Sequence, residues 1–172
     1  MSSSQFDSVE ILPADKEHLE EIRQLARQIW FAHYPGIISV DQINYMLERD
    51  YDVGTLAHDL DNGVSIDRLM VDGELRGFAA YGPCEDSLDC KLHKIYLGES
   101  FHGLGLGSMI LRNVEAQCAA RGATRVILSV NKHNEKAIRA YEHNGYARLE
   151  SVVVDIGGGF VMDDYIMGKE LA

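Results

Sequence analysis

A glycine-rich turn between two apolar runs places the firmest limit on how this chain can fold. The turn reads His102-Gly103-Leu104-Gly105-Leu106-Gly107-Ser108 and lies between the strand-like run 92–97 and the helix-like run 109–120. Alternating glycines leave several backbone N–H groups free to point at one spot, and the dipole of the following helix makes that spot electropositive. The sequence therefore predicts a strand, a phosphate-binding turn and a helix in succession.

Two familiar nucleotide-binding motifs do not fit the spacing of these glycines. A G-x-G-x-x-G fingerprint that begins at Gly103 needs a glycine at Ser108, and one that begins at Gly105 needs a glycine at Ile110. The Gly-Lys-Ser/Thr ending of a P-loop does not occur in the chain. Taken alone, the turn is equally typical of a tight strand-to-helix connection that binds nothing.

Hydrophobic periodicity divides the chain into a helical first third and a mixed remainder. The spacing predicts helices over 15–31, from about 41, and over 53–60. From residue 64 it predicts strands and helices that together complete an α/β fold in one domain, 1–172, in the order α-α-β-β-β-α-β-α-β-β. These elements are the strands 65–71, 75–81 and 89–97, a helix to about 121, the strand 125–130, a helix over 134–143, and the strands 146–155 and 161–169.

Charge and apolar patterning exclude two classes of partner. The chain has 27 acidic and 16 basic residues, a formal net charge of -11. This excess repels nucleic acid and anionic lipid and favours a cationic partner, with an ordinary solvated surface as the alternative. No apolar run approaches the roughly 20 residues that span a bilayer, and the first residues lack a signal-peptide pattern, so we expect a soluble protein with no membrane partner.

The cysteines indicate neither a disulfide framework nor a zinc site. Cys84, Cys90 and Cys118 are odd in number and form no C-x-x-C pair. We therefore expect no metal, and a reducing, cytoplasmic location fits.

Two motifs in combination resemble those of the GNAT superfamily of acyl-CoA-dependent N-acetyltransferases. The family motif Arg/Gln-x-x-Gly-x-Gly/Ala matches residues 102–107 except at its first position, which is His102. The family motif Asn-x-x-Ala-x-x-x-Tyr-x-x-x-Gly-Phe/Tyr appears as Asn134, Ala137, Tyr141, Gly145 and Tyr146. The resemblance covers residues 64–170 and implies a mixed, mostly antiparallel central sheet flanked by helices.

The resemblance implies acetyl-CoA as cosubstrate and direct attack of a primary amine on its thioester. It divides the domain into a helical acceptor-side part, 1–63, and a sheet with the acetyl-CoA-binding core, 64–170. The backbone N–H of Ile95 is expected to polarise the thioester carbonyl, and the main chain of Leu97 to pair with the pantetheine arm. The full set of cofactor-binding residues so implied is Ile95, Tyr96, Leu97, His102, Gly103, Leu104, Gly105, Leu106, Gly107, Ser108, Asn134, Ala137 and Tyr141.

The same resemblance assigns a general acid but leaves the base open. Tyr141 matches the residue that protonates the leaving thiolate. The position that carries a glutamate base in some members is Lys91, which cannot accept a proton while charged. His93 is the preferred base because it alternates with Lys91 and Ile95 on one strand face and titrates near neutral pH. Glu85 and Asp89 are further candidates, and a strand histidine without a catalytic role is the competing interpretation.

In this family the first helices and the last strand loop usually select the acceptor. We accordingly expect Trp30, Tyr34 and Tyr45 to line an acceptor cleft, with core packing as the alternative. Asp163 and Asp164 are expected to attract a cationic amine, with a solvated turn as the alternative. The glycines 157–159 predict a mobile loop or a plain hairpin turn beside the site.

Two classes of function follow from these patterns. The first is an N-acetyltransferase that acts on a small-molecule amine, a polyamine-like cation, or a peptide or protein amine. The second is a non-catalytic CoA-binding sensor or interaction module, motivated by the departures at His102 and Lys91. Many relatives form homodimers, but no feature of this sequence identifies an interface.

Overall fold

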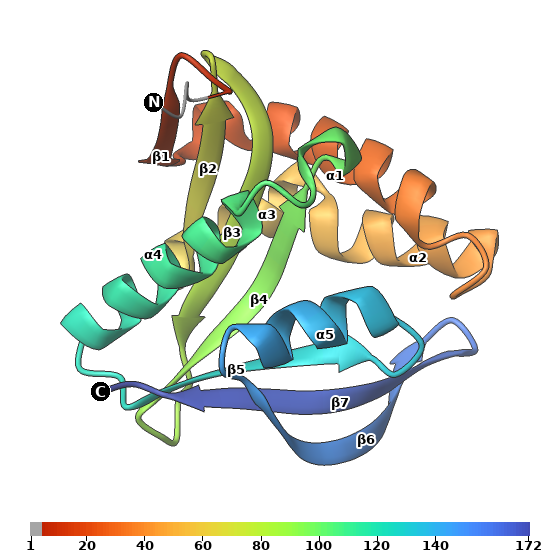
Figure 1. The fold of residues 1–172 in the computed structure, drawn as a ribbon. Coiled ribbons are helices and arrows are strands. Elements are labelled where there is room, and N and C mark those ends of the chain that lie inside the picture. Colours follow the sequence, from red (N-terminus) through yellow and green to blue (C-terminus); the bar gives the residue numbers. More distant parts are fainter. Residues whose placement is uncertain (1–4) are drawn as a thin grey trace.

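One mixed sheet organises the protein. The computed structural model describes residues 5–172, and within them the strands follow the order β1-β2-β3-β4-β5-β7-β6 (Figure 1). All neighbouring strands are antiparallel except β4 and β5, which are parallel. The strands are β1 (Val9–Pro13), β2 (Ser65–Val71), β3 (Glu74–Pro83), β4 (Asp89–Leu97), β5 (Arg125–Asn131), β6 (Ala147–Gly157) and β7 (Phe160–Glu170). The expected mixed, mostly antiparallel sheet is confirmed.

Helices cover both faces of this sheet (Figure 1). One face packs against α1 (Leu19–His33), α2 (Val40–Tyr51) and α3 (Val53–Asp61), around a buried cluster that includes Ile43 and Phe78. The other face packs against α4 (Leu106–Ala120) and α5 (Glu135–His143), around a cluster that includes Val114, Leu128 and Ile138. Alternate residues of β2 and β3 enter the two clusters, as the period of a strand requires. None of the helices within residues 5–172 is long and apolar enough to cross a membrane.

The first part of the chain was expected to be helical throughout, and this expectation is wrong. β1 pairs antiparallel with β2 along Val9–Pro13 and forms one edge of the sheet. This strand is short and ends in proline, so it gives too little alternation for periodicity to detect. The segment 1–63 therefore contributes one strand to the sheet in addition to its helices.

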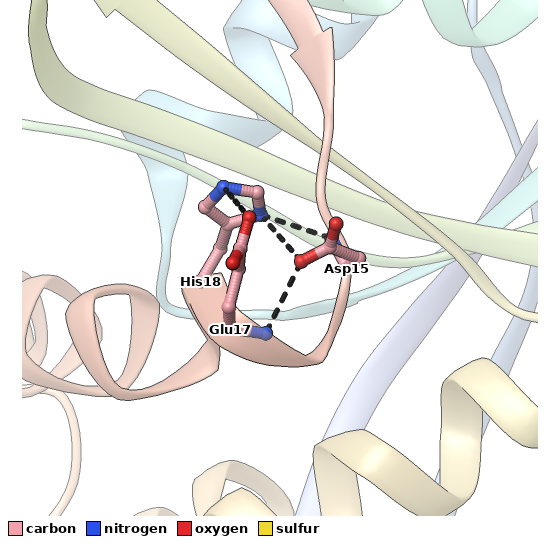
Figure 2. Close-up of side chains that lie close together, drawn as sticks. All are labelled: Asp15, Glu17 and His18. Atoms are coloured by element: carbon pink, nitrogen blue, oxygen red, sulfur yellow. Dashed lines mark hydrogen bonds and ion pairs between the residues drawn. The ribbon is translucent and has the colours of Figure 1, made fainter.

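A capping box, and not a metal site, explains a group of polar side chains before α1. Asp15 Oδ1 accepts a hydrogen bond from the Glu17 N–H at 3.1 Å, and His18 Nδ1 accepts one from the Asp15 N–H at 3.0 Å (Figure 2). These bonds begin the 3₁₀ turn η1 (Lys16–His18) that leads into α1. The cap already uses Asp15 Oδ1 and His18 Nδ1, so we assign the group to helix initiation.

The expectation of no disulfide is wrong. Cys90 of β4 and Cys118 of α4 form one, and both residues are buried in the cluster under α4. They are 28 residues apart in sequence. Only the packing of α4 across the sheet brings them together, which is why the spacing of cysteines did not indicate the pair. Cys84 is not part of this bond.

β4 and β5 separate where β4 carries a bulge. Their last paired residues are Leu92 and Leu128. On the other side of β4, Leu92 pairs with Tyr81 and Lys94 with Ala80, which leaves His93 as an extra residue without a partner in β3.

The bulge reverses the alternation of side chains along β4. Leu92 and Ile95 pack on the α4 side of the sheet, whereas Tyr96 packs on the α1–α3 side. The expectation that His93 shares one face with Lys91 and Ile95 is therefore wrong, because the extra residue shifts the phase of the strand.

Candidate active site

A cavity of about 850 Å³ occupies the opening between β4 and β5. Its walls come from the end of β4, the glycine turn, α1, α2, α5, β6 and β7. The expected site residues that line it are Trp30, Tyr34, His93, Ile95, Tyr96, Leu97, His102, Gly103, Gly105, Gly107, Ser108, Asn134, Ala137, Tyr141 and Asp164.

Some of the expected residues do not line this cavity. The Leu104 side chain is exposed, and that of Leu106 is buried in the core. Among the further candidate bases, Glu85 is exposed, and Asp89 forms a two-bond ion pair with Arg125 at 3.0 and 2.8 Å. Neither Glu85 nor Asp89 contributes to the walls of the cavity. Leu104 and Leu106 can contribute only through their backbone.

The glycine turn presents a row of unpaired backbone donors. Gly103 and Gly105 have φ angles of 77° and 79°, and Gly105 precedes the first residue of α4 without any side-chain cap. In the part of the chain that the structure describes, no group accepts a hydrogen bond from the N–H of residues 103–108. Apart from chain neighbours and the backbone of α4, a Cβ at Gly103, Gly105 or Gly107 would meet no atom within 4 Å, and all three glycines line the cavity. Unpaired donors at the start of a helix are an arrangement that can bind an anion.

His102 takes part in a chain of contacts that the motif did not predict. Its Nε2–H donates to the Leu97 carbonyl at 2.8 Å, and its Nδ1 accepts a hydrogen bond from Lys136 Nζ at 2.8 Å. Lys136 lies on α5 and lines the cavity. Lys136 therefore brings a positive charge beside position 102 from another helix.

Asn134 connects the two sides of the cleft. It precedes α5, is buried, and its Oδ1 accepts hydrogen bonds from the Ala137 N–H at 3.4 Å and from His33 Nε2–H at 3.1 Å. His33 belongs to α1 and is 101 residues away in sequence. The contact joins the start of α5 to the end of α1.

Tyr141 faces the cavity from α5. Its ring packs edge-on against Tyr146 with ring centres 5.9 Å apart. Within residues 5–172 its hydroxyl has no hydrogen-bond partner. Burial, together with the nearby Tyr34, raises the pKa of Tyr141 above its ordinary value. The hydroxyl is therefore protonated at neutral pH and free to donate.

His93 lies among cations. Although its ring is open to the cavity, the surrounding protein lowers its pKa to about 4, and Lys91 and Lys94 add to this effect. Lys94 is itself largely buried, with Nζ 3.8 Å from Asp59 and 5.1 Å from the centre of the Tyr51 ring. His93 is neutral at pH 7, but as a base it is weak.

Aromatic side chains of α1 and β4 form one wall of the cavity. The hydroxyls of Tyr34 and Tyr96 are 3.1 Å apart, and Trp30 packs against both rings at 4.4 and 5.8 Å between centres. Trp30 and Tyr34 pack in the hydrophobic core and also line the cavity, so core packing and a position in the cavity wall are compatible for both residues. Tyr45 is not in this wall, contrary to expectation. Its hydroxyl donates to the Ile156 carbonyl at 2.7 Å, and a Cβ would lie 2.6 Å from this hydroxyl at Gly157 and 2.8 Å from the Tyr45 ring at Gly158.

The two acidic residues near the chain end have different environments. Neither lies in a solvated turn, because both belong to β7 and the hairpin turn is at Gly158 and Gly159. Asp163 forms an ion pair with Lys132 at 2.6 Å. Asp164 is only 3% exposed and lines the cavity. Asp163 is thus a surface carboxylate paired with a lysine, whereas Asp164 is a buried carboxylate in the cavity wall.

Sequence reasoning missed Lys136, Lys94 and His33 as residues of this site. All three lie in the cavity wall. Lys136 lies inside the second motif, between Asn134 and Ala137, at a position that the motif leaves unspecified. No spacing indicated that α5 and α1 meet over the same cleft.

A family profile described as "Acetyltransferase (GNAT) family" matches residues 19–146, more than half of the chain. An uncharacterized N-acetyltransferase of Mycobacterium tuberculosis is 34% identical over 100 residues, which cover 58% of this chain and 63% of that protein. The mycothiol acetyltransferase of Corynebacterium efficiens is 36% identical over 81 residues, 47% of this chain and 27% of that protein. The chain thus spans less than two thirds of the length of these relatives.

Solved structures show the same fold. The PaiA N-acetyltransferase of Thermoplasma acidophilum, in complex with coenzyme A, superposes with a TM-score of 0.80 at 24% identity, over 95% of this chain and 99% of that one. The ribosomal-protein-S18-alanine N-acetyltransferase of Escherichia coli gives a TM-score of 0.73 at 17% identity, over 96% and 95% of the two chains.

Proposed function

Because the chain belongs to the GNAT acetyltransferase family, we propose that it transfers an acetyl group from acetyl-CoA to a primary amine held at the far end of the cavity. The observation that carries this proposal is the row of unpaired N–H groups at residues 103–108, which open onto the same cavity as Tyr141 and Asp164.

The glycine turn fits the diphosphate of CoA. Six backbone N–H groups and the dipole of α4 favour an anion there. Lys136 adds a full positive charge beside His102, where the family has arginine or glutamine. Since a charge-assisted hydrogen bond is stronger than a neutral one, this lysine supports a phosphate oxygen well.

The end of β4 fits the remainder of the cofactor. The Gly98 N–H donates to the Arg76 carbonyl at 2.9 Å, so Arg76 and Gly98 form a hydrogen-bonded pair. One and three residues further along the ladder, Gly77 is opposite Leu97 and Ala79 is opposite Ile95, and both are non-hydrogen-bonded pairs. Because hydrogen-bonded and non-hydrogen-bonded pairs alternate in an antiparallel ladder, the backbone groups of Ile95 and Leu97 point away from β3 and into the opening. The Leu97 carbonyl is already used by His102. The N–H of Ile95 is then the donor for the thioester carbonyl, and the N–H of Leu97 pairs with the pantetheine arm.

When bound, acetyl-CoA supplies a thioester whose carbonyl carbon an amine can attack. Tyr141 donates its hydroxyl proton to the departing sulfur. The absence of a competing acceptor for this hydroxyl, within the described chain, supports the role. The net charge of -11 favours an acceptor that arrives as a cation.

A thiol-release assay with acetyl-CoA and a panel of primary amines tests the proposal, together with calorimetric titration of CoA. We expect CoA binding and turnover with at least one amine. A protein that binds no CoA contradicts acetyl transfer and CoA sensing alike. CoA binding without turnover across the panel would instead favour the non-catalytic module.

A further inference from the structure

Asp164 is a buried carboxylate to which residues 5–172 provide no hydrogen-bond donor. Its side chain is 3% exposed and its Oδ1 atom is fully buried. In residues 5–172, no N–H or O–H group donates a hydrogen bond to either of its oxygens. A buried carboxylate without a donor is costly, and a ligand that brings N–H groups removes that cost.

The register of the sheet surrounds this carboxylate with apolar side chains. Met162 and Ile166 lie two residues before and after it on the same face of β7, and Val152 of β6 is its direct partner. All three line the cavity. On the other side its partner is Asn131 of β5. A ligand whose charged group meets Asp164 would therefore also meet the apolar side chains of Met162, Ile166 and Val152.

Several charged or titratable groups act on Asp164 from the neighbouring elements. Burial raises the pKa of Asp164 to about 6, Asp163 adds to the rise, and Lys132 and Lys91 oppose it. Tyr34, at the end of α1, faces the carboxylate and stays protonated because burial raises its pKa. On β6, Glu150 lines the same wall beside Ile166. Asp164 is therefore ionised at neutral pH, yet it takes up a proton more readily than an ordinary aspartate.

We propose that Asp164 binds the ammonium group of the acceptor and then accepts its proton, and that the acceptor is a primary amine on an apolar alkyl or aryl stem. This inference rests on the proposed acetyl transfer. It replaces His93 as the base, because His93 lies among lysines that disfavour a bound cation.

The protons and electrons balance as follows. The ammonium transfers one proton to the Asp164 carboxylate and becomes a neutral amine. The nitrogen lone pair forms the C–N bond to the thioester carbonyl carbon, and the C–S bond breaks with its electron pair on sulfur. Tyr141 gives its proton to that sulfur and regains one from the nitrogen, which leaves a neutral amide and CoA thiol. Asp164 then releases its proton to solvent.

Binding tests the recognition step. The wild-type protein, saturated with CoA, is titrated by calorimetry with phenethylamine and with 3-phenylpropionate, which carries a carboxylate in place of the ammonium. We expect the amine to bind at least about tenfold more tightly than the acid, and Asp164→Asn to remove this preference. Equal affinities for amine and acid, or an unchanged preference in the variant, would overturn the proposal.

Kinetics test the proton transfer. With the best amine of the panel, kcat/KM of the wild type should rise with pH around pH 6, where Asp164 loses its proton. Asp164→Asn should lack this rising limb, and its kcat/KM at pH 7.5 should be about 100-fold below that of the wild type. Asp163→Asn is the matched control, since it removes the same charge one residue away. It should keep nearly full activity and move the limb to lower pH, because Asp163 raises the pKa of Asp164.

The outcomes separate this inference from the proposed function. Turnover by the wild type with an unchanged rate and pH limb in Asp164→Asn contradicts the role of Asp164 and leaves acetyl transfer intact. In that case loss of the limb in His93→Gln would identify His93 as the base. A wild type that neither binds CoA nor releases thiol contradicts the proposed function itself.

Discussion

Our proposal assigns one end of the cavity to the cofactor and the other to the acceptor, and these two ends differ in the kind of group that lines them. At the cofactor end the groups are mainly backbone N–H donors of residues 103–108 and of β4. At the acceptor end they are side chains from three distant segments, such as Tyr34, His93 and Asp164. Backbone donors are fixed by local conformation, whereas side chains depend on which elements the fold brings together. The cofactor end is therefore expected to tolerate few changes of backbone, and the acceptor end to tolerate few changes of charge.

The largest effect is expected from Gly105→Arg. At φ 79° a non-glycine residue is strained, and the long side chain would fill the open space in front of the N–H row. We expect CoA affinity to fall about 1000-fold, which corresponds to about 4 kcal/mol, measured by calorimetry.

Gly122→Arg is the control for this change. Gly122 has φ 87° and equally open surroundings, but it follows the other end of α4. It should lose similar stability and keep CoA affinity. A comparable loss of CoA affinity in both variants would mean that strain, and not the anion site, explains the first result.

Tyr141→Phe should separate chemistry from binding. The ring remains and only the proton donor is lost, so we expect kcat to fall about 100-fold with an unchanged CoA affinity. Tyr146→Phe is the control because its hydroxyl donates to Glu115 at 3.2 Å, outside the cavity. Wild-type kcat in Tyr141→Phe would remove the acid role.

Asp164→Asn should stabilise the protein in a pH-dependent manner. A folded-state pKa of about 6, against 3.8 for an ordinary aspartate, means that the native state holds this proton more tightly than the unfolded state. The stabilisation that the wild type gains from protonated Asp164 is therefore present at low pH. As pH rises from about 4 through 6, the free energy of unfolding of the wild type falls by up to about 3 kcal/mol.

Chemical denaturation at pH 5 and pH 7.5 checks this prediction. The gain of Asp164→Asn over the wild type should be larger at pH 7.5. A gain that is the same at both pH values would contradict the raised pKa. Increased stability with reduced activity would also show that the kinetic defect is not caused by unfolding.

The smallest effect is expected from Lys136→Gln. Loss of one charge-assisted contact should reduce CoA affinity about tenfold and weaken its dependence on salt. Arg139→Gln removes one charge from the exposed part of the same helix, away from the cavity, and should leave affinity unchanged. Equal behaviour of the two variants would exclude a specific role for Lys136.

Much of the fold could be predicted from local pattern. The strands Ser65–Val71 and Asp89–Leu97 have the predicted bounds, and Ser39 and Asn134 begin α2 and α5 as their residue types suggest. β1 and the disulfide between Cys90 and Cys118 could not be predicted, because each depends on a partner far away in sequence. The bulge at His93 also follows from pairing with β3, and no residue of the strand marks it.

The sequence by itself determined the glycine turn and its unpaired donors, because alternating glycines at the start of a helix free the same N–H groups in any tertiary context. It also indicated Tyr141 through its place in the second motif. Only the tertiary structure decided that Lys136 supplies the charge beside His102, that Tyr45 supports a hairpin, and that Asp164 is buried and unpaired. These properties arise from contacts between β4, α5 and β7, and burial and charge at a position are set by its neighbours in space.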